Sequence, residues 1–123
     1  MKVQNELKKL LEKEAIAFST ADKKGNPHVI AVGFVKVISK DEILITANYM
    51  NETINNLKQN KNVALAIWCR NWEKECIGYE LKGEANYFNS GKYLDIIKKI
   101  PENQEMPAKG AILVKINKIK KVS

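Results

Sequence analysis

The residues from position 48 to position 53 combine short polar side chains with the start of a predicted helix. Asn48, Asn51 and Thr53 can each donate a hydrogen bond. A helix that begins near Asn51 exposes unpaired amides and a partial positive charge, which suits a phosphate. Ordinary capping explains the same residues, because Asn51 is a common N-cap and Glu52 is favourable near the positive end of the helix dipole. The pattern therefore leaves two interpretations open, a capped helix or an anion site.

Other site chemistries find little support in the sequence. His28 is the single histidine, and without a Gly-x-Ser-x-Gly elbow it does not indicate a serine-hydrolase triad. Neither a GxxxxGK loop nor a GxGxxG turn is present. Cys69 and Cys76 lack the spacing and companions of a closed zinc site, and we interpret them as small reduced side chains rather than a disulfide. We therefore predict no metal site and name no catalytic side chain.

Composition limits the class of protein. The 123 residues, 45% of them hydrophobic, suit a single domain over residues 1–123 with a packed core. Apolar runs are too short to cross a bilayer, and the charged N-terminus does not resemble a signal peptide, so we expect a cytoplasmic location and no membrane partner. The net charge of +7 favours anionic partners, among them phosphorylated cofactors and nucleic acid.

Hydrophobic periodicity predicts the elements that position the polar corner. Helices are expected over residues 3–15, 51–60 and 90–100. Strands are expected over residues 15–21, 28–38, 43–47, 62–68, 76–88 and 111–122, with turns or loops at 22–27, 69–75 and 101–110. Connections this short favour antiparallel pairing, and the first three strands are expected to form a meander. The predicted fold is mainly β, a six-stranded antiparallel barrel of Greek-key type, closed or partly open, with short helices.

The same patterning predicts which side chains are buried and where elements end. The first helix should bury Val3, Leu7, Leu10, Leu11 and Ala15, and the middle helix Ile54 and Leu57. Ser90 is expected to cap the third helix, whose buried stripe would be Tyr93, Ile96, Ile97 and Ile100. The lysines of the last strand indicate an edge strand that discourages pairing with other sheets.

Three segments in order carry a resemblance to a known family. They are "TADKKGNPHVIAVGFVKV", "ILITANYMNETINNLKQNKNVALAIW" and "YELKGEANYF". Together they resemble the FMN-binding split-barrel superfamily typified by pyridoxamine 5′-phosphate oxidase, over about residues 8–118. The order of the motifs is more specific than any one of them. The resemblance implies FMN as cofactor and a homodimer with two equivalent flavin sites between the subunits.

Carried over by position, the resemblance implies a set of site residues. His28, Val29, Ile30 and Ala31 would lie along the flavin, and Thr46, Ala47 and Asn48 would line its ring or ribityl chain. Met50, Asn51 and Thr53 would face the phosphate. Trp68 and Tyr79 would either close the site from the partner chain or simply pack in the core or interface.

Glu52 departs from the family pattern. Relatives commonly have a cation at the phosphate turn, whereas Glu52-Thr53 stands here, so a carboxylate replaces a charge-assisted contact. Lys36 or a lysine of the last strand is a candidate for compensation. The chain is also shorter than pyridoxamine phosphate oxidases and lacks their arginine-rich C-terminal segment, so that particular activity is not expected.

Three functional hypotheses follow. The first is a flavin-dependent oxidoreductase that uses FMN and a small-molecule redox partner, with the flavin carrying the electrons. The second keeps the fold but not the turnover, as a carrier or sensor of flavin or another phosphorylated ligand, and Glu52 motivates it. The third, a basic barrel that binds nucleic acid, is disfavoured because the few aromatic residues fall mostly at expected core positions.

Overall fold

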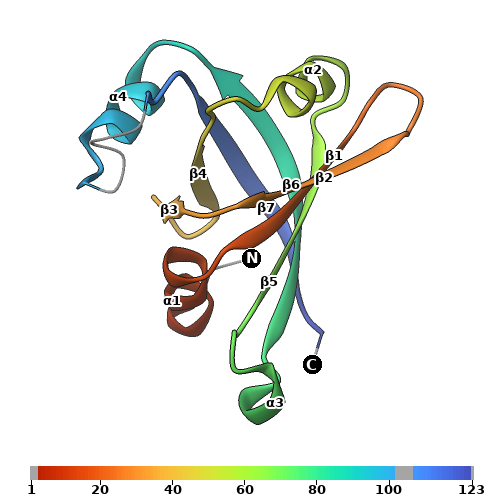
Figure 1. Cartoon of the computed structure of the whole chain (residues 1–123), viewed down its shortest axis with the longest axis vertical. Helices are drawn as coiled ribbons and strands as arrows, with labels where there is room; N and C mark the ends of the chain where they lie inside the picture. Colours follow the sequence, from red (N-terminus) through yellow and green to blue (C-terminus); the bar gives the residue numbers. More distant parts are fainter. Residues whose placement is uncertain (1–2, 102–106, 123) are drawn as a thin grey trace.

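A computed structural model describes residues 3–101 and 107–122 (Figure 1). Its strands are β1 (Ile16–Ala21), β2 (Pro27–Val32), β3 (Val35–Val37), β4 (Glu42–Thr46), β5 (Asn62–Trp68), β6 (Gly78–Phe88) and β7 (Ala111–Lys121). Its helices are α1 (Asn5–Lys13), α2 (Asn51–Gln59), α3 (Trp72–Glu75) and α4 (Lys92–Lys99). The described residues include no helix long and apolar enough to cross a membrane. The cytoplasmic location stays a prediction.

All pairings in the single sheet are antiparallel, in the order β2-β1-β5-β6-β7-β4-β3. The two strands at the ends of this order, β2 and β3, follow one another in the chain with only Gly33 and Phe34 between them. The sheet must therefore curl until its two edges approach, as Figure 1 shows. This confirms the predicted fold class, a mainly β antiparallel split barrel with short helices.

The predicted strand over residues 28–38 is two strands, so the described residues hold seven rather than six. β2 pairs with β1, for example Phe18 with Ile30, whereas β3 pairs with β4, for example Val35 with Ile45. The chain changes its neighbour at Gly33, and no single ladder can continue through such a change. The two pairings of the predicted meander are therefore confirmed, but the prediction that its middle strand is one element is wrong.

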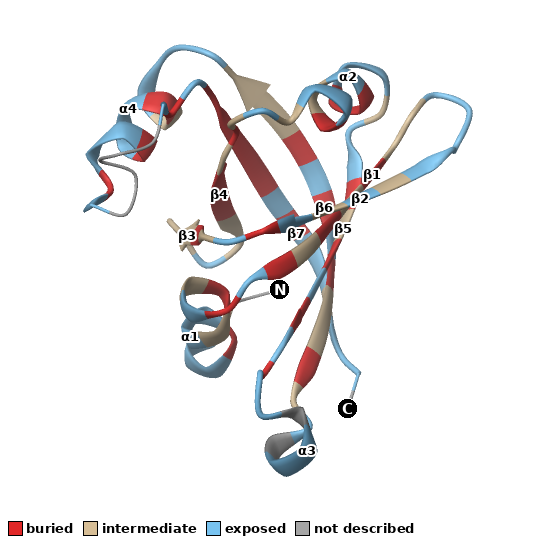
Figure 2. Cartoon of the chain, viewed as in Figure 1, coloured by how far each residue is buried: buried red, intermediate tan, exposed pale blue. Residues whose placement is uncertain are grey.

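The main core lies inside the curled sheet (Figure 2). Phe18, Leu65 and Leu81 stand opposite one another on β1, β5 and β6 and are buried. Leu7 and Leu11 of α1 pack on this cluster. A second cluster forms on the other face of β4 and β7, where α4 covers Leu44 and Leu113. Central residues of β4 are consequently buried on both faces.

Several helix and edge predictions need correction. Ala15 lies beyond the end of α1 and is exposed. Gly91, with φ of +92°, precedes the first residue of α4, so Ser90 is not its cap; Leu94 is buried there, while Ile96 is exposed. Residues 72–75 form the short helix α3 where a loop was expected, and of the expected loop 101–110, residues 102–106 lie outside the described residues.

The last strand is not simply an edge. β7 pairs with β6 along its length and with β4 over Ala111–Lys115, so its first half is an interior strand. The outward lysines follow in the second half, which pairs with β6. Cys69 and Cys76 are not joined in a disulfide, as predicted. No group of three or more potential metal ligands occurs among the residues that were described.

Gly83 is expected to be essential to the β6–β7 ladder. It lies at a register shift, and a Cβ added there would be 2.2 Å from the carbonyl oxygen of Lys115. Gly83→Ala should therefore lower the free energy of unfolding by about 1–3 kcal/mol, measured by urea denaturation. Gly33→Ala is the control, because no atom lies within 4 Å of its added Cβ, and a change within about 0.5 kcal/mol is expected. Equal losses in both variants would contradict this assignment.

Candidate functional site

The polar corner connects the end of β4 to the start of α2, and two hydrogen bonds hold it in place. The amide of Ala47 donates to the carbonyl oxygen of Gly110 at 2.8 Å, and Asn48 Oδ1 accepts from the amide of Lys109 at 3.0 Å. Tyr49 then adopts φ of +56°, in the left-handed region, which turns the chain into the helix. The segment just before β7 thus fixes the corner from a distant part of the sequence.

Helix α2 begins at Asn51, but its cap differs from the expectation. The N-cap is Met50, and its side chain makes no capping hydrogen bond. Asn51 is the first helical residue, so the capping interpretation of Asn51 that the sequence left open does not hold. A thioether is at best a weak acceptor, and the first amides of a helix have no partners within it. The start of α2 is therefore open to an anion.

Thr53 is the residue that most clearly indicates a ligand. Its side chain is 1% exposed, and its Oγ1 has no hydrogen-bond partner among the described residues. The neighbouring buried threonine, Thr20, is different, because its Oγ1 accepts from Asn56 Nδ2 at 3.0 Å. A buried hydroxyl without a partner costs about 1–3 kcal/mol, which a protein tolerates where function requires it.

A hollow of about 400 Å³ brings most of the predicted site residues together. It is lined by His28, Ile30 and Ala31 of β2 and by Asn48, Tyr49, Met50, Asn51, Glu52 and Thr53 of the corner. Strand β2 and the start of α2 are separate in sequence, and the curl of the sheet makes them neighbours (Figure 1).

Three residues of the predicted set are not part of this lining. The side chain of Val29 is 63% exposed, because alternation along β2 turns it to the outer face of the sheet. Ala47 is buried in the core, and Thr46 is the half-buried last residue of β4. Tyr49 lines the hollow although the sequence interpretation left it out. Its place between Asn48 and Met50 was the available signal.

The charged side chains around the hollow show which cations lie near the carboxylate of Glu52. Glu52 Oε2 lies 3.1 Å from His28 Nδ1, so the carboxylate faces β2 across the hollow. Lys36, a candidate compensating cation, is 3.7 Å from Glu12 of α1 instead. Lys121 of β7 is 3.5 Å from Glu6. Lys109 has its Nζ 4.6 Å from the ring centroid of Tyr49, at the corner itself.

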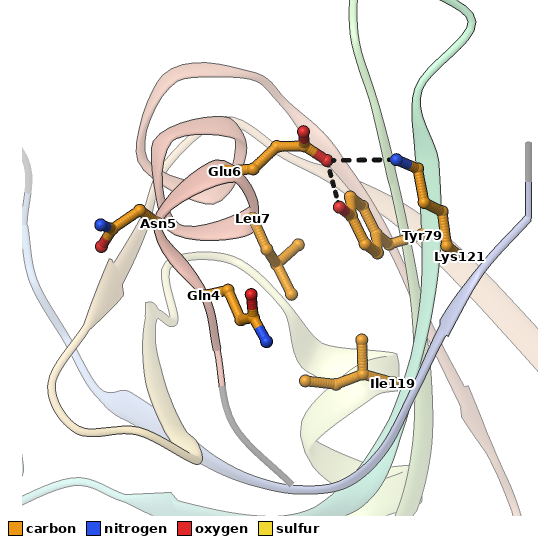
Figure 3. Close-up of a pocket in the computed structure, with 7 residues that line it drawn as sticks. All are labelled: Gln4, Asn5, Glu6, Leu7, Tyr79, Ile119 and Lys121. Atoms are coloured by element: carbon orange, nitrogen blue, oxygen red, sulfur yellow. Dashed lines mark hydrogen bonds and ion pairs between the residues drawn. The ribbon is translucent and has the colours of Figure 1, made fainter.

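A larger hollow, of about 800 Å³, lies at the opposite end of the sheet, between the start of α1, the start of β6 and the end of β7 (Figure 3). Here the Tyr79 hydroxyl donates to Glu6, which lowers the pKa of Glu6; Lys121 lowers it further. Burial and the hydrogen bond to Glu6 raise the pKa of Tyr79 to about 12. Tyr79 therefore stays a neutral donor, and Glu6 is already matched by two partners.

The residues that line this second hollow are better explained as contacts that attach α1 to the sheet than as an anion site. Its lysine is balanced by Glu6, and Leu7 of the same helix turn is part of the main core. Tyr79 packs against that core, in keeping with the packing role among its two predicted roles. Trp68 is exposed at the end of β5 and, like Tyr79, does not line the corner hollow of this chain.

Because the Thr53 hydroxyl has no described partner, its removal is expected to raise the unfolding free energy rather than lower it. Thr53→Val removes a buried polar group that has no partner, so the ligand-free protein should gain about 1 kcal/mol of unfolding free energy in urea denaturation. Thr20→Val is the matched control: it leaves Asn56 Nδ2 without its acceptor and should lose about 1–3 kcal/mol. A loss in Thr53→Val comparable to that of Thr20→Val would show that Thr53 has a partner.

Comparison with known proteins places this geometry in a family. The family model for pyridoxamine 5′-phosphate oxidase matches residues 3–123. An uncharacterized protein of Methanocaldococcus jannaschii is 34% identical over 124 residues, which cover 97% of this chain and 80% of the relative.

Two solved structures show the same fold at lower identity. HupZ of Group A Streptococcus matches with a TM-score of 0.86 at 20% identity, over 98% of this chain and 94% of that chain. An FMN-binding protein from Syntrophomonas wolfei matches with a TM-score of 0.79 at 24% identity, over 94% of this chain and 83% of that chain. With its curled antiparallel sheet and a family model matching almost its whole length, the chain belongs to the pyridoxamine 5′-phosphate oxidase family.

Proposed function

We propose that this protein binds FMN at the corner before α2 and acts as a flavin-dependent oxidoreductase in a homodimer. The observation that carries the proposal is the buried, unpartnered Thr53 Oγ1 beside an uncapped helix start. A phosphate would satisfy both at once, because its oxygens accept from a hydroxyl and from helix amides. Family membership and the fold shared with an FMN-binding protein support the choice of ligand.

The residues of the hollow divide according to the parts of FMN. Asn51 and Thr53, at the open start of α2, would hold the phosphate. The ring and ribityl chain would lie along β2, against His28, Ile30 and Ala31, with Met50 supplying apolar contact. A volume of about 400 Å³ falls within the usual range of ligand pockets. Val29, Thr46 and Ala47 would contribute through the backbone, since their side chains do not line the hollow.

Bound FMN would supply hydride or single-electron transfer, and the protein would supply orientation and polarity. The apolar side chains of Ile30 and Met50 would exclude water from one side of the ring. The paired His28 and Glu52 would set the polarity at the edge of the hollow. A small molecule that gives or takes the electrons would enter from the open side.

The outer face of β2, β1 and β5 supports a homodimer. Directly paired residues on this face are small or apolar: Ala17 with Ala31 and Ala66, Ser19 with Val29 and Ala64, and Ala21 with Pro27. Such a surface of small side chains allows a second sheet to approach closely, and Val29 leaves a large apolar side chain exposed on it. Ala31 also lines the hollow, so a second copy on this face would sit next to the flavin. An isologous two-fold pair is the commonest arrangement for such a surface.

The alternative is a carrier or sensor that binds FMN or another phosphorylated ligand without turnover. Glu52 favours it, because a carboxylate beside the phosphate would weaken retention of the cofactor. Reduction by a nicotinamide donor followed by reoxidation distinguishes the two functions. Nucleic-acid binding is less favoured, because two lysines of β7 stand opposite glutamates of β6, Lys120 at Glu80 and Lys115 at Glu84.

The test of cofactor binding is a titration with FMN, followed by quenching of flavin fluorescence and by the absorption spectrum of the purified protein. We expect uptake of one FMN per chain and a yellow protein. Thr53→Val should bind FMN about 10- to 150-fold more weakly, the cost of one hydrogen bond to a charged group, although its ligand-free form is more stable. A colourless protein that takes up no FMN would refute the proposed function.

The test of the dimer is the molar mass in solution by light scattering. We expect a dimer for the wild type and a monomer for Ala66→Arg, which puts a long charged side chain into the middle of the small-residue face. Asn117→Arg, on the exposed part of β7, is the matched control and should stay dimeric. A dimer that survives Ala66→Arg unchanged would exclude this face as the interface.

A further inference from the structure

We propose that Lys109, in the segment before β7, is the cation that holds the ligand phosphate. It takes the role of the cation that relatives commonly have where Glu52 stands in this chain. This inference rests on the proposed function of the same site. It assigns phosphate recognition to a residue outside the strand-to-helix motif. It also predicts that the site selects phosphorylated flavin over unphosphorylated flavin through that residue.

The backbone of Lys109 is fixed to the corner. Its amide donates to Asn48 Oδ1 at 3.0 Å, and the next residue, Gly110, accepts from the amide of Ala47 at 2.8 Å. Gly110 also lies close under Tyr87, where an added Cβ would be 2.5 Å from the ring, so the chain has little freedom there. Lys109 is therefore held beside the residues that line the hollow.

The side chain of Lys109 extends over the residue that turns the corner. Its Nζ lies 4.6 Å from the ring centroid of Tyr49, which lines the hollow and is 74% exposed. An ammonium over an exposed ring is held weakly, whereas a phosphate offers it a charge-assisted hydrogen bond. Because the lysine stem is long and flexible, the ammonium can leave the ring for a phosphate at the helix start.

Three other lysines have described partners of their own. Lys36 lies by Glu12, Lys121 by Glu6, and the Nζ of Lys61 donates to Asn86. The Nδ1 of His28 lies 3.1 Å from Glu52, so its described contact is with that carboxylate. Lys109 is consequently the lysine whose described contact at the corner is to a neutral ring.

The experiment compares FMN with riboflavin, which has the same ring and ribityl chain but no phosphate. Dissociation constants are measured by fluorescence quenching for the wild type, Lys109→Ala, Lys109→Arg and Lys120→Ala, at low and high salt. Lys120→Ala removes the same charge from the exposed surface of β7 and is the matched control. Thermal melting of each variant checks that it folds.

We expect Lys109→Ala to weaken FMN binding about three- to tenfold and to leave riboflavin binding within twofold, since only the phosphate loses a partner. The salt dependence of FMN binding should become shallower in this variant. Lys109→Arg should keep most of the FMN affinity, and Lys120→Ala should match the wild type.

The possible negative results distinguish the role of Lys109 from the proposed function. FMN binding that Lys109→Ala leaves unchanged, or weakens equally with riboflavin, overturns the role of Lys109 while the flavin site stands. A wild-type protein that binds neither flavin overturns the proposed function and this inference with it.

Discussion

The exchange of neighbours at Gly33–Phe34 is the constraint on which the rest of the structure depends. One extended segment supplies both edges of the sheet, β2 beside β1 and β3 beside β4, so the sheet has to curl around the core of Phe18, Leu65 and Leu81. The same curl brings β2 next to the corner that follows β4. The hollow is thus a consequence of closing the barrel, and the antiparallel ladders that bury the core also determine where a ligand can enter.

The corner concentrates features that reduce the stability of the ligand-free protein. Tyr49 is held at positive φ, a conformation that costs a residue with a Cβ about 1–2 kcal/mol. Met50 leaves the first amides of α2 without a cap, and Thr53 Oγ1 is buried without a partner. Among the other described residues the buried side-chain polar atoms have partners, as Thr20 and Asn56 show. Such deficits, gathered at one site within a well-packed domain, are the usual signature of a surface organised for a ligand.

Electrostatics distinguish the corner hollow from the hollow beside α1. At the far end of the sheet, Glu6, Tyr79 and Lys121 satisfy one another and attach α1. At the corner, Glu52 lies 3.1 Å from His28 and places a carboxylate in the first turn of α2. The net charge at the corner therefore depends on the charged side chains of the segment before β7. A smaller hollow with unsatisfied donors is thus a better candidate for function than a larger one whose charges already match.

The sequence by itself determined the fold class, most element positions and the segment of the candidate site, because hydrophobic periodicity and turn residues act locally, and because the order of the motifs resembles a known family. His28, Asn51 and Thr53 could be named from that order. Only the tertiary structure decided that residues 28–38 divide into two strands, that Met50 rather than Asn51 precedes α2, and that Lys109 reaches Tyr49. Each of these depends on which distant segment lies alongside: β1 or β4 for the divided strand, and the segment before β7 for the corner. Periodicity within one segment carries no information about such neighbours, since they are set by the closure of the whole sheet.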